Sequence, residues 1–466
     1  MMTPNMNHAA RFAAVASLLA APAFAQYKQV NPQVSKIVSQ ISAERIAETQ
    51  KKLVGFGTRM LLSKQDDPAR GIGAARKWIY TQFQSYSPRL EVGYDVHRVK
   101  KMEGAASRIP RDTDLYNVIA VLPGTTNKEE RILIGGHYDS IVLGKPGGGE
   151  PEPGEILPLR DPDLDAPGAT DDASGTAAVL ELARVLSQYT FEKTLVFITF
   201  AGEEEGLVGS NLYAAKAKEE GQKIEALLNN DIIGFDTSLG GRTESHRVAI
   251  YSEDPQDSPS RQIARYVQDM AERYVPWMHA DPVFRADRFG RGGDHTPFNM
   301  EGFAAVRITT PQENLANEHS ITDVFANTVP EYTARVAQVN AAAAASLAWA
   351  PKTPATTHDV TRNGRKTTEL LLDRGKSRID AHLTWINADP EPDLLGYAVV
   401  WRTTTAAFWE HELFVGNVSE YTFPGVSIDD LVYGVKAVDK EGNESLVAAF
   451  VPGPRVKRKI ETVDQP

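Results

Sequence analysis

The sequence predicts an α/β protein with a mixed, mostly parallel sheet covered by helices on both faces, followed by an all-β sandwich. Strand patterns alternate with helical patterns over about residues 30–350, and only alternating strand patterns follow this part. The 466 residues are enough for two or three domains. With 42% hydrophobic and 24% charged residues, the composition is that of a globular protein, which excludes a disordered chain and a multi-span membrane protein.

The first residues, 1–25, predict a signal peptide. Arg11 precedes an apolar run, and Ala23 and Ala25 form the A-x-A pattern of a cleavage site before Gln26. The run is shorter than the roughly 20 apolar residues that span a membrane. We therefore expect export to the periplasm or the cell exterior, and no later apolar run predicts a membrane span.

The part over residues 26–350 begins with helical patterns. Apolar residues at helical spacing predict helices over 31–53, 73–86, 174–186, 207–219 and 330–349. Apolar or alternating runs predict strands over 90–99, 116–122, 131–134, 194–200, 225–229, 247–251 and 303–308. Continuous apolar runs are typical of strands that are covered on both faces. Residues 144–167 are rich in Pro, Gly and acidic residues and predict a long surface loop.

The part after residue 350 predicts a second, all-β domain. Residues 351–358 predict a linker, and a β-sandwich is expected over 359–453. Its period-2 strand patterns lie at 383–386, 396–402 and 433–439. Three aromatic residues have a spacing that resembles that of a fibronectin type III module: Trp385, Tyr397 and Tyr433. The last residues, 454–466, predict a solvated tail.

The charge and the cysteine count exclude several classes of function. Lys and Arg number 50 against 61 Asp and Glu, so this acidic chain is a poor candidate for binding nucleic acid phosphates. Cysteine is absent, which excludes disulfides, a thiol nucleophile and thiolate metal ligands. No G-x-S-x-G motif stands between a predicted strand and a helix, which argues against a serine hydrolase. A metal would have to bind to His, Asp and Glu.

Polar motifs follow the predicted strands, where ligands bind in open α/β sheets. His137 follows the strand over 131–134, and Asp139 lies two residues further. That spacing suits a carboxylate that orients a metal-bound histidine through its second ring nitrogen. Asp171 and Asp172 precede a helix, and helix capping accounts for one acidic residue more easily than for two.

Three more motifs carry acidic side chains at or near strand ends. In the first of them, the apolar strand over 194–200 is followed by Glu203, Glu204 and Glu205. In the second, Asp231 follows the strand over 225–229. The third contains His319. Charges beside a buried strand end are costly unless they are paired or bind a metal. Together the motifs supply two histidines and several carboxylates, enough for two cations that share a bridging carboxylate. Nitrogen and oxygen ligands suit a catalytic pair of zinc ions, with manganese or cobalt as alternatives.

The order of these motifs resembles that of the co-catalytic di-zinc exopeptidases related to bacterial leucyl-type aminopeptidases, glutamate carboxypeptidase II and the transferrin receptor. The resemblance covers about residues 50–350 and implies a zinc exopeptidase-like fold. It implies five metal ligands: His137, Asp171, Glu204, Asp231 and His319. Asp171 would bridge two zinc ions, with His137 and Asp231 on one ion and Glu204 and His319 on the other.

The resemblance also implies the supporting roles. Glu203 would be the general base and acid, and Asp139 would orient His137. The family pattern Glu-Glu-x-Gly-Leu assigns the variable place to Glu205. His295 lies in a segment that resembles a neighbouring part of the family site, so His319 is the preferred ligand. The peptide bond between residues 171 and 172 is usually cis in the family.

The function implied is that of an exported metallo-aminopeptidase that hydrolyses N-terminal peptide bonds of peptide substrates with a metal-activated water. A carboxypeptidase or dipeptidase is an alternative on the same scaffold and needs a cationic pocket, for which the candidates are Arg285, Arg288, Arg291 and Arg307. A glutaminyl cyclase with one zinc ion is another alternative on the same scaffold. An inactive binding protein is an alternative of a different class, but all five ligand positions are filled. The sequence indicates no oligomeric state.

Overall fold

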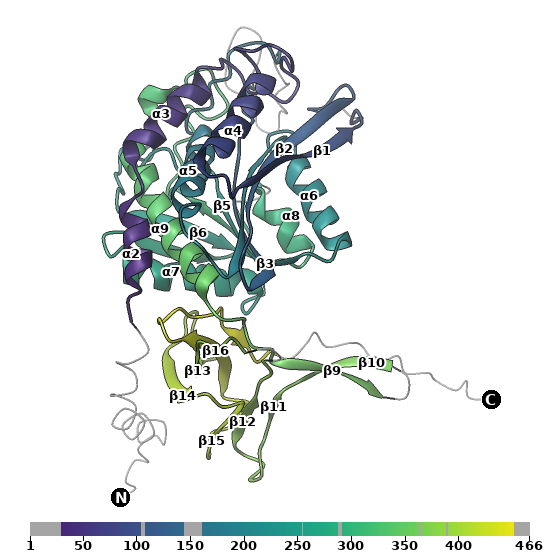
Figure 1. The fold of residues 1–466 in the computed structure, drawn as a ribbon, viewed down its shortest axis with the longest axis vertical. Coiled ribbons are helices and arrows are strands. Elements are labelled where there is room, and N and C mark those ends of the chain that lie inside the picture. The colour runs from purple at the N-terminus through teal and green to yellow at the C-terminus, as the bar shows by residue number, and fades with distance from the viewer. Residues whose placement is uncertain are drawn as a thin grey trace, which may run out of the picture. The chain divides into compact units, whose positions relative to one another are not determined.

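The computed structural model describes residues 29–103, 108–143, 161–253, 255–287, 291–362, 365–387 and 390–451, and Figure 1 shows its ribbon. Two compact units divide the chain between Ala350 and Pro351, and the short segment 441–446 belongs to the first of them. We call them the α/β unit and the β unit. The predicted signal peptide and tail lie outside the described residues, as does most of the predicted loop over 144–167.

An eight-stranded mixed sheet forms the centre of the α/β unit, in the order β1-β2-β4-β3-β5-β8-β6-β7. Its strands are β1 (Glu91–Val99), β2 (Thr113–Leu122), β3 (Asn127–His137), β4 (Lys193–Phe200), β5 (Lys223–Asn230), β6 (Arg247–Ser252), β7 (His279–Phe284) and β8 (Ala305–Thr309). Parallel pairing joins β4, β3, β5 and β8 in the middle, whereas β1, β2 and β6 run antiparallel to neighbours. The predicted mixed α/β sheet is confirmed.

Helices cover both faces of this sheet, and each face has its own apolar core. The larger core contains residues of α2 (Pro32–Ser39), α3 (Ala43–Val54), α4 (Ile72–Tyr86), α5 (Ala173–Leu186), α7 (Pro259–Tyr274) and α9 (Pro330–Trp349). The smaller core contains residues of α6 (Val208–Glu219) and α8 (His295–Met300). Figure 1 shows α6 and α8 together on one side of the sheet, with α5 and α9 on the other.

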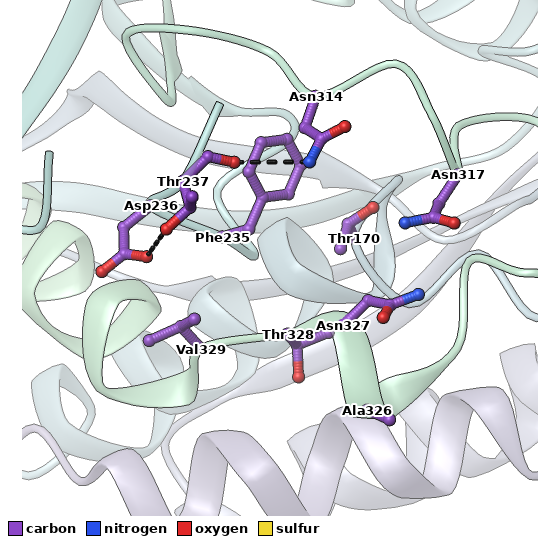
Figure 2. A pocket seen from close by; sticks show the side chains of 10 residues that line it. All are labelled: Thr170, Phe235, Asp236, Thr237, Asn314, Asn317, Ala326, Asn327, Thr328 and Val329. Atoms are coloured by element: carbon purple, nitrogen blue, oxygen red, sulfur yellow. Dashed lines mark hydrogen bonds between the residues drawn. The ribbon is translucent and has the colours of Figure 1, made fainter. Parts of the chain in front are cut away.

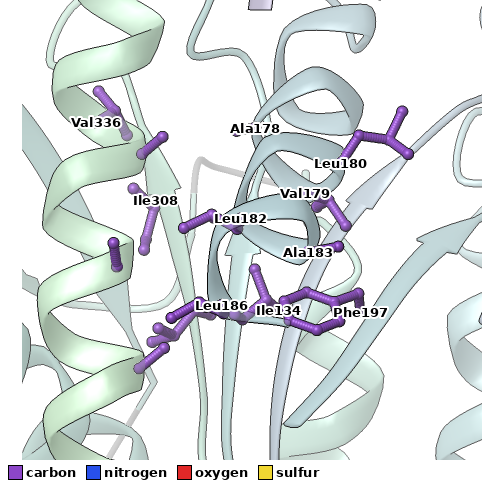
Figure 3. Close-up of a cluster of buried hydrophobic side chains, with 14 of the residues drawn as sticks. Ile134, Ala178, Val179, Leu180, Leu182, Ala183, Leu186, Phe197, Ile308 and Val336 are labelled. Atoms are coloured by element: carbon purple, nitrogen blue, oxygen red, sulfur yellow. The ribbon is translucent and has the colours of Figure 1, made fainter. Parts of the chain in front are cut away.

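The larger core explains why most residues of α5 are apolar. Leu182 of α5 lies between the sheet and α9 and points toward Ile308, with Ile134 and Phe197 of the sheet below it (Figure 3). All four side chains are fully buried. Burying a side chain of this size contributes about 1.5–3 kcal/mol. This packing holds the C-terminal half of α5 against the central strands.

The structure differs from the predicted pattern in two ways. The helical segment predicted over 31–53 is two helices, because Ser42 interrupts it and caps α3 by accepting a hydrogen bond from the Arg45 main-chain nitrogen at 3.3 Å. The predicted elements also omit α7, β7 and the short helix α8. Ser258 caps α7 and Pro259 opens it, a start signal that the apolar spacing alone did not reveal.

The β unit holds two antiparallel sheets that share one core. The first contains β11 (Leu372–Asp373), β12 (Ala381–Thr384) and β15 (Glu420–Phe423), and the second β13 (Leu394–Thr403), β14 (His411–Gly416), β16 (Leu431–Asp439) and β17 (Ala448–Ala449). A further hairpin consists of β9 (Thr357–Arg362) and β10 (Arg365–Leu370), and it begins inside the predicted linker. Trp385 and Tyr397 pack with ring centroids 5.4 Å apart. The fibronectin type III resemblance stays a prediction.

None of the helices in the described part of the chain combines the length and the apolarity that a membrane crossing needs.

Candidate metal centre

The predicted motifs meet at one edge of the central sheet. His137 is the last residue of β3, Glu203 and Glu204 follow the end of β4, and Asp231 directly follows β5. Because β3, β4 and β5 run parallel, their carboxyl ends lie at the same edge. Asp171 reaches this edge from the start of α5, and His319 from the loop between β8 and α9.

The five side chains form two clusters that share Asp171. His137, Asp171 and Asp231 make the first cluster, and Asp171, Glu204 and His319 the second; within each, one ligand atom per residue lies within 4.8 Å of the others. His137 Nε2 lies 3.0 Å from Asp171 Oδ1 and 3.8 Å from Asp231 Oδ1. His319 Nε2 lies 3.2 Å from both Asp171 Oδ2 and Glu204 Oε2. One carboxylate oxygen of Asp171 therefore faces each cluster.

The donor atoms fit a metal ion. His137 Nε2 and Glu204 Oε1 are buried, and neither has a hydrogen-bond partner in the described structure. Burying such groups unpaired is costly, and coordination removes the cost. Two ring nitrogens and three carboxylates, with no sulfur, form a donor set that zinc accepts. His137, Asp171 and Asp231 would hold one ion, and Asp171, Glu204 and His319 a second.

Asp172 is the structural member of the acidic pair. Its Oδ1 accepts a hydrogen bond from the Gly175 main-chain nitrogen at 2.8 Å and so caps α5. The same side chain accepts hydrogen bonds from the main-chain nitrogens of His137 and Ile232, both at 3.3 Å. It thereby links α5 to the ends of β3 and β5. The peptide bond between Asp171 and Asp172 is cis, as the family resemblance predicts.

Asp139 lies behind the centre and contacts both His137 and the Glu203–Glu204 turn. Its carboxylate accepts hydrogen bonds from the main-chain nitrogens of Glu203 at 3.4 Å and Glu204 at 3.2 Å. Its Oδ1 is 3.6 Å from His137 Nδ1, whereas the Asp139 main-chain oxygen is closer, at 3.3 Å. The carboxylate of Asp139 therefore positions the Glu203–Glu204 turn, and its main-chain carbonyl is the nearer partner of the histidine ring.

Glu203 lies beside the two clusters and belongs to neither. Its side chain is half-buried. Burial raises the pKa of Glu203 well above its ordinary value, and the charges of Asp231, Glu204 and Asp294 raise it further, although His137 opposes them. A carboxyl group with these surroundings binds protons more tightly than an exposed one.

Glu205 and His295, which lie near the predicted ligands in the sequence and could have been mistaken for them, lie outside the clusters. Glu205 is buried, and neither of its carboxylate oxygens has a hydrogen-bond partner in the described structure. His295 is fully buried at the start of α8, with Nε2 3.6 Å from Glu253 Oε1. The structure therefore brings together Glu204 and His319 rather than these neighbours.

Arg307, which the sequence offered as a candidate for a cationic pocket, instead holds one cluster residue. Arg307 of β8 is fully buried, and its Nε donates to Asp231 Oδ2 at 2.8 Å. Its other nitrogens donate to Asp287 Oδ1 at 3.3 Å and Glu313 Oε1 at 3.0 Å. Arg307 thus leaves only Oδ1 of Asp231 facing His137. An arginine inside an otherwise apolar strand, Ala305–Thr309, is the sequence signal for this role.

Asp323 holds the main chain that carries the shared carboxylate of Asp171. Its Oδ2 accepts a hydrogen bond from the Asp171 main-chain nitrogen at 3.1 Å, and its Oδ1 accepts bonds from Thr170 at 3.0 Å (N) and 2.7 Å (Oγ1). Burial raises the pKa of Asp323 to about 6, although these hydrogen bonds lower it. The side chain is almost fully buried.

We expect Asp323→Asn to weaken zinc binding by about 10–100-fold, because one acceptor oxygen becomes an NH₂ group that faces main-chain N–H donors. The free energy of unfolding should fall by about 1–3 kcal/mol. Competition with a chromogenic chelator and thermal unfolding measure the two effects. Asp380→Asn is the control, because Asp380 also accepts a main-chain hydrogen bond, from Gly425 at 2.8 Å, but lies in the β unit. Equal zinc affinity in both variants would contradict the role of Asp323.

A separate cavity of about 250 Å³ lies beside the loop that carries His319 (Figure 2). Amides and hydroxyls dominate its lining, and Asn314 Nδ2 donates to the Thr237 main-chain oxygen at 3.4 Å. Thr170 lines it and directly precedes Asp171, but the five cluster residues do not line it. The cavity is therefore distinct from the metal centre.

Comparisons with known proteins agree with this site. The model of peptidase family M28 matches residues 117–344. A probable zinc metalloprotease of Leptosphaeria maculans is 34% identical over 448 residues, which cover 90% of this chain and 97% of that protein. The LapA aminopeptidase of Legionella pneumophila aligns with a TM-score of 0.51 and 20% identity over 69% of this chain and 76% of that one. A glutaminyl cyclase of Macrostomum lignano aligns with a TM-score of 0.50 and 17% identity over 67% and 91%.

The two structural likenesses show that the fold is shared. The likeness to the Leptosphaeria maculans protein extends over nearly the whole of both chains, and the family model spans the five cluster residues. Zinc, which that relative's name contains, also agrees with the nitrogen and oxygen donors of the two clusters. The chain therefore belongs to peptidase family M28 and is a metal-dependent peptide hydrolase.

Proposed function

We propose that the protein is an exported aminopeptidase that binds two zinc ions and releases N-terminal residues from peptides. The observation that carries this proposal is the carboxylate of Asp171, whose two oxygens face two separate clusters. A carboxylate shared in this way is typical of paired metal sites. Export is supported by the signal-peptide pattern of residues 1–25.

In the proposed mechanism, the two clusters would hold zinc, which would supply polarisation of the scissile carbonyl and a more acidic water molecule. Glu203, which is not needed as a ligand, accepts a proton from the attacking water. The water oxygen bonds to the carbonyl carbon, and the bond from that carbon to the leaving nitrogen breaks. Glu203 then gives its proton to the leaving amine. Asp139 keeps Glu203 in place through the main chain of the Glu203–Glu204 turn.

The charges around the centre favour an N-terminal substrate over a C-terminal one. A carboxypeptidase needs a cation that is available to a substrate carboxylate. Arg307 is fully buried between three carboxylates, and Arg291 pairs with Glu313 and Glu318. The Arg285 guanidinium contacts main-chain oxygens, and Arg288 lies outside the described residues. The remaining acidic surroundings suit a free α-amine near Glu203 and Asp231.

Glutaminyl cyclase activity would need a single zinc ion in this scaffold. The second cluster argues for two ions, because His319 lies 3.2 Å from Asp171, nearly as close as His137 at 3.0 Å, and also lies 3.2 Å from Glu204. Zinc stoichiometry separates the two functions.

A substrate panel tests the proposal. We expect hydrolysis of aminoacyl-p-nitroanilides and of peptides with a free N-terminus and a blocked C-terminus. The N-acetylated forms should not be hydrolysed, and a chelator should abolish activity, which zinc restores. Hydrolysis confined to N-blocked peptides with a free C-terminus would show a carboxypeptidase. Cyclisation of N-terminal glutamine without peptide hydrolysis would show the cyclase.

A further inference from the structure

A buried arginine outside the matched family region contacts the loops of the metal centre. Arg59 lies just after α3, and its side chain is fully buried. Its Nε donates to the Tyr138 main-chain oxygen at 2.7 Å, and its Nη2 to that of Gly168 at 2.8 Å. Its Nη1 donates to the main-chain oxygens of Pro167 at 2.7 Å and Leu53 at 3.2 Å. One guanidinium therefore binds four carbonyl groups of three chain segments.

Two of these segments present the metal ligands. Tyr138 stands between His137 and Asp139, and Gly168 stands three residues before Asp171. A carbonyl held at each of these places fixes the backbone from which the ligand side chains project. The rigid planar fork of an arginine suits this task, because it sets the directions as well as the distances of its hydrogen bonds.

The main chain around Arg59 strengthens the link. Its nitrogen donates to Ser140 Oγ at 3.1 Å, and its oxygen accepts from the Ser140 nitrogen at 3.3 Å. Ser140 Oγ in turn donates to the Ala166 main-chain oxygen at 2.7 Å, and the Ala166 nitrogen donates to the Gly57 oxygen at 2.9 Å. The segment at residues 57–59 therefore lies between the loop after β3 and the loop before α5.

Gly168 shows how close the guanidinium approaches. Its φ is +48°, and a Cβ at this position would lie 3.0 Å from Arg59 Nη2 and 2.6 Å from the Ser140 Cβ. Burial lowers the pKa of Arg59 to about 10, while Asp323, Asp139, Asp172 and Asp171 raise it. The group is therefore charged at neutral pH, and its charge is of opposite sign to the carboxylates of the centre.

We propose that Arg59 is a positioning residue for the metal centre, whose guanidinium holds the loops that present His137 and Asp171 at a fixed separation. This inference rests on the proposed two-zinc function. The matched family region begins at residue 117, so this contribution comes from the N-terminal part of the α/β unit. Arg59 touches no cluster residue's ligand atom and acts through the backbone.

The test compares Arg59→Ala and Arg59→Lys with the same changes at Arg402. Arg402 is also buried and also donates to main-chain oxygens, those of Thr403 at 3.2 Å and Ala406 at 2.7 Å, but it lies in the β unit. Zinc dissociation constants are measured in the full chain, without substrate, by competition with a chromogenic chelator. Thermal unfolding of the zinc-loaded proteins measures stability.

We expect both Arg59 variants to bind zinc about 10–100-fold more weakly, and kcat to fall more than KM rises. Guanidinium at non-denaturing concentration should restore part of the affinity of Arg59→Ala by occupying the space beside the four carbonyls. The Arg402 variants should lose stability and keep zinc affinity. If Arg59→Ala does not fold, Arg59→Lys decides the question.

Wild-type zinc affinity in a folded Arg59 variant, or an equal loss of affinity in the Arg402 variants, overturns the proposal. Absence of guanidinium rescue in a folded Arg59→Ala also overturns it. The proposed function is tested separately, and it is wrong if the wild-type chain does not release N-terminal residues.

Discussion

Glu203→Gln is expected to lower kcat by about 10²–10⁴-fold while zinc content stays at the wild-type value. The amide keeps the size and the hydrogen-bonding shape of the side chain but cannot accept a proton from the attacking water. Because Glu203 belongs to neither cluster, the ligands remain complete. Single-turnover kinetics on an aminoacyl-p-nitroanilide and metal analysis of the same preparation measure both quantities.

Glu205→Gln is the matched control for this prediction. Glu205 lies two residues away in the same acidic run, is buried, and stands outside both clusters. We expect its kcat to remain close to that of the wild type. If Glu205→Gln loses activity and Glu203→Gln keeps it, the family pattern is shifted by one residue, and Glu204 and Glu205 take the two functional places. Loss of zinc from Glu203→Gln would instead make this residue a ligand.

Asp171→Asn is expected to reduce zinc content from two ions per chain to fewer than one. An amide offers one oxygen where the carboxylate offers two, and each oxygen of Asp171 faces its own cluster. Activity should fall by about 10³-fold or more, because the metal charges contribute several kcal/mol to stabilising the transition state. Metal analysis after gel filtration in zinc-free buffer measures the stoichiometry.

Glu204→Gln provides the comparison, because it changes only the cluster that contains His319. We expect this variant to lose one zinc ion and to retain the other. Equal zinc content in the wild type and Asp171→Asn would show that the shared carboxylate is not a ligand.

Local patterns predicted the central sheet and the polar motifs at its strand ends, whereas the choice of the five cluster residues came from the resemblance to the di-zinc exopeptidases. His137 and Asp231 stand directly at the ends of apolar strands, and parallel strands bring such ends together. Asp171 lies at the start of an apolar helix whose position follows from the same pattern. These residues can be placed at one edge without knowledge of any long-range contact.

The partners of the residues that support the ligands could not be predicted from local patterns, even where, as for Arg307, the surrounding strand indicates a buried side chain. Arg59 meets Tyr138 across 79 positions, Arg307 meets Asp231 across 76, and Asp323 meets Thr170 across 153. Nothing in the local sequence around Arg59 distinguishes a guanidinium that binds carbonyls from one at the surface. The break between α2 and α3 was missed because the local pattern itself is misleading: the apolar period continues across the cap at Ser42.

The most direct test of the two-zinc centre is a crystal structure with anomalous scattering recorded on both sides of the zinc absorption edge. We expect two zinc peaks on either side of the Asp171 carboxylate, one beside His137 and Asp231 and the other beside Glu204 and His319. A single peak, or peaks bound by other side chains, would contradict the account.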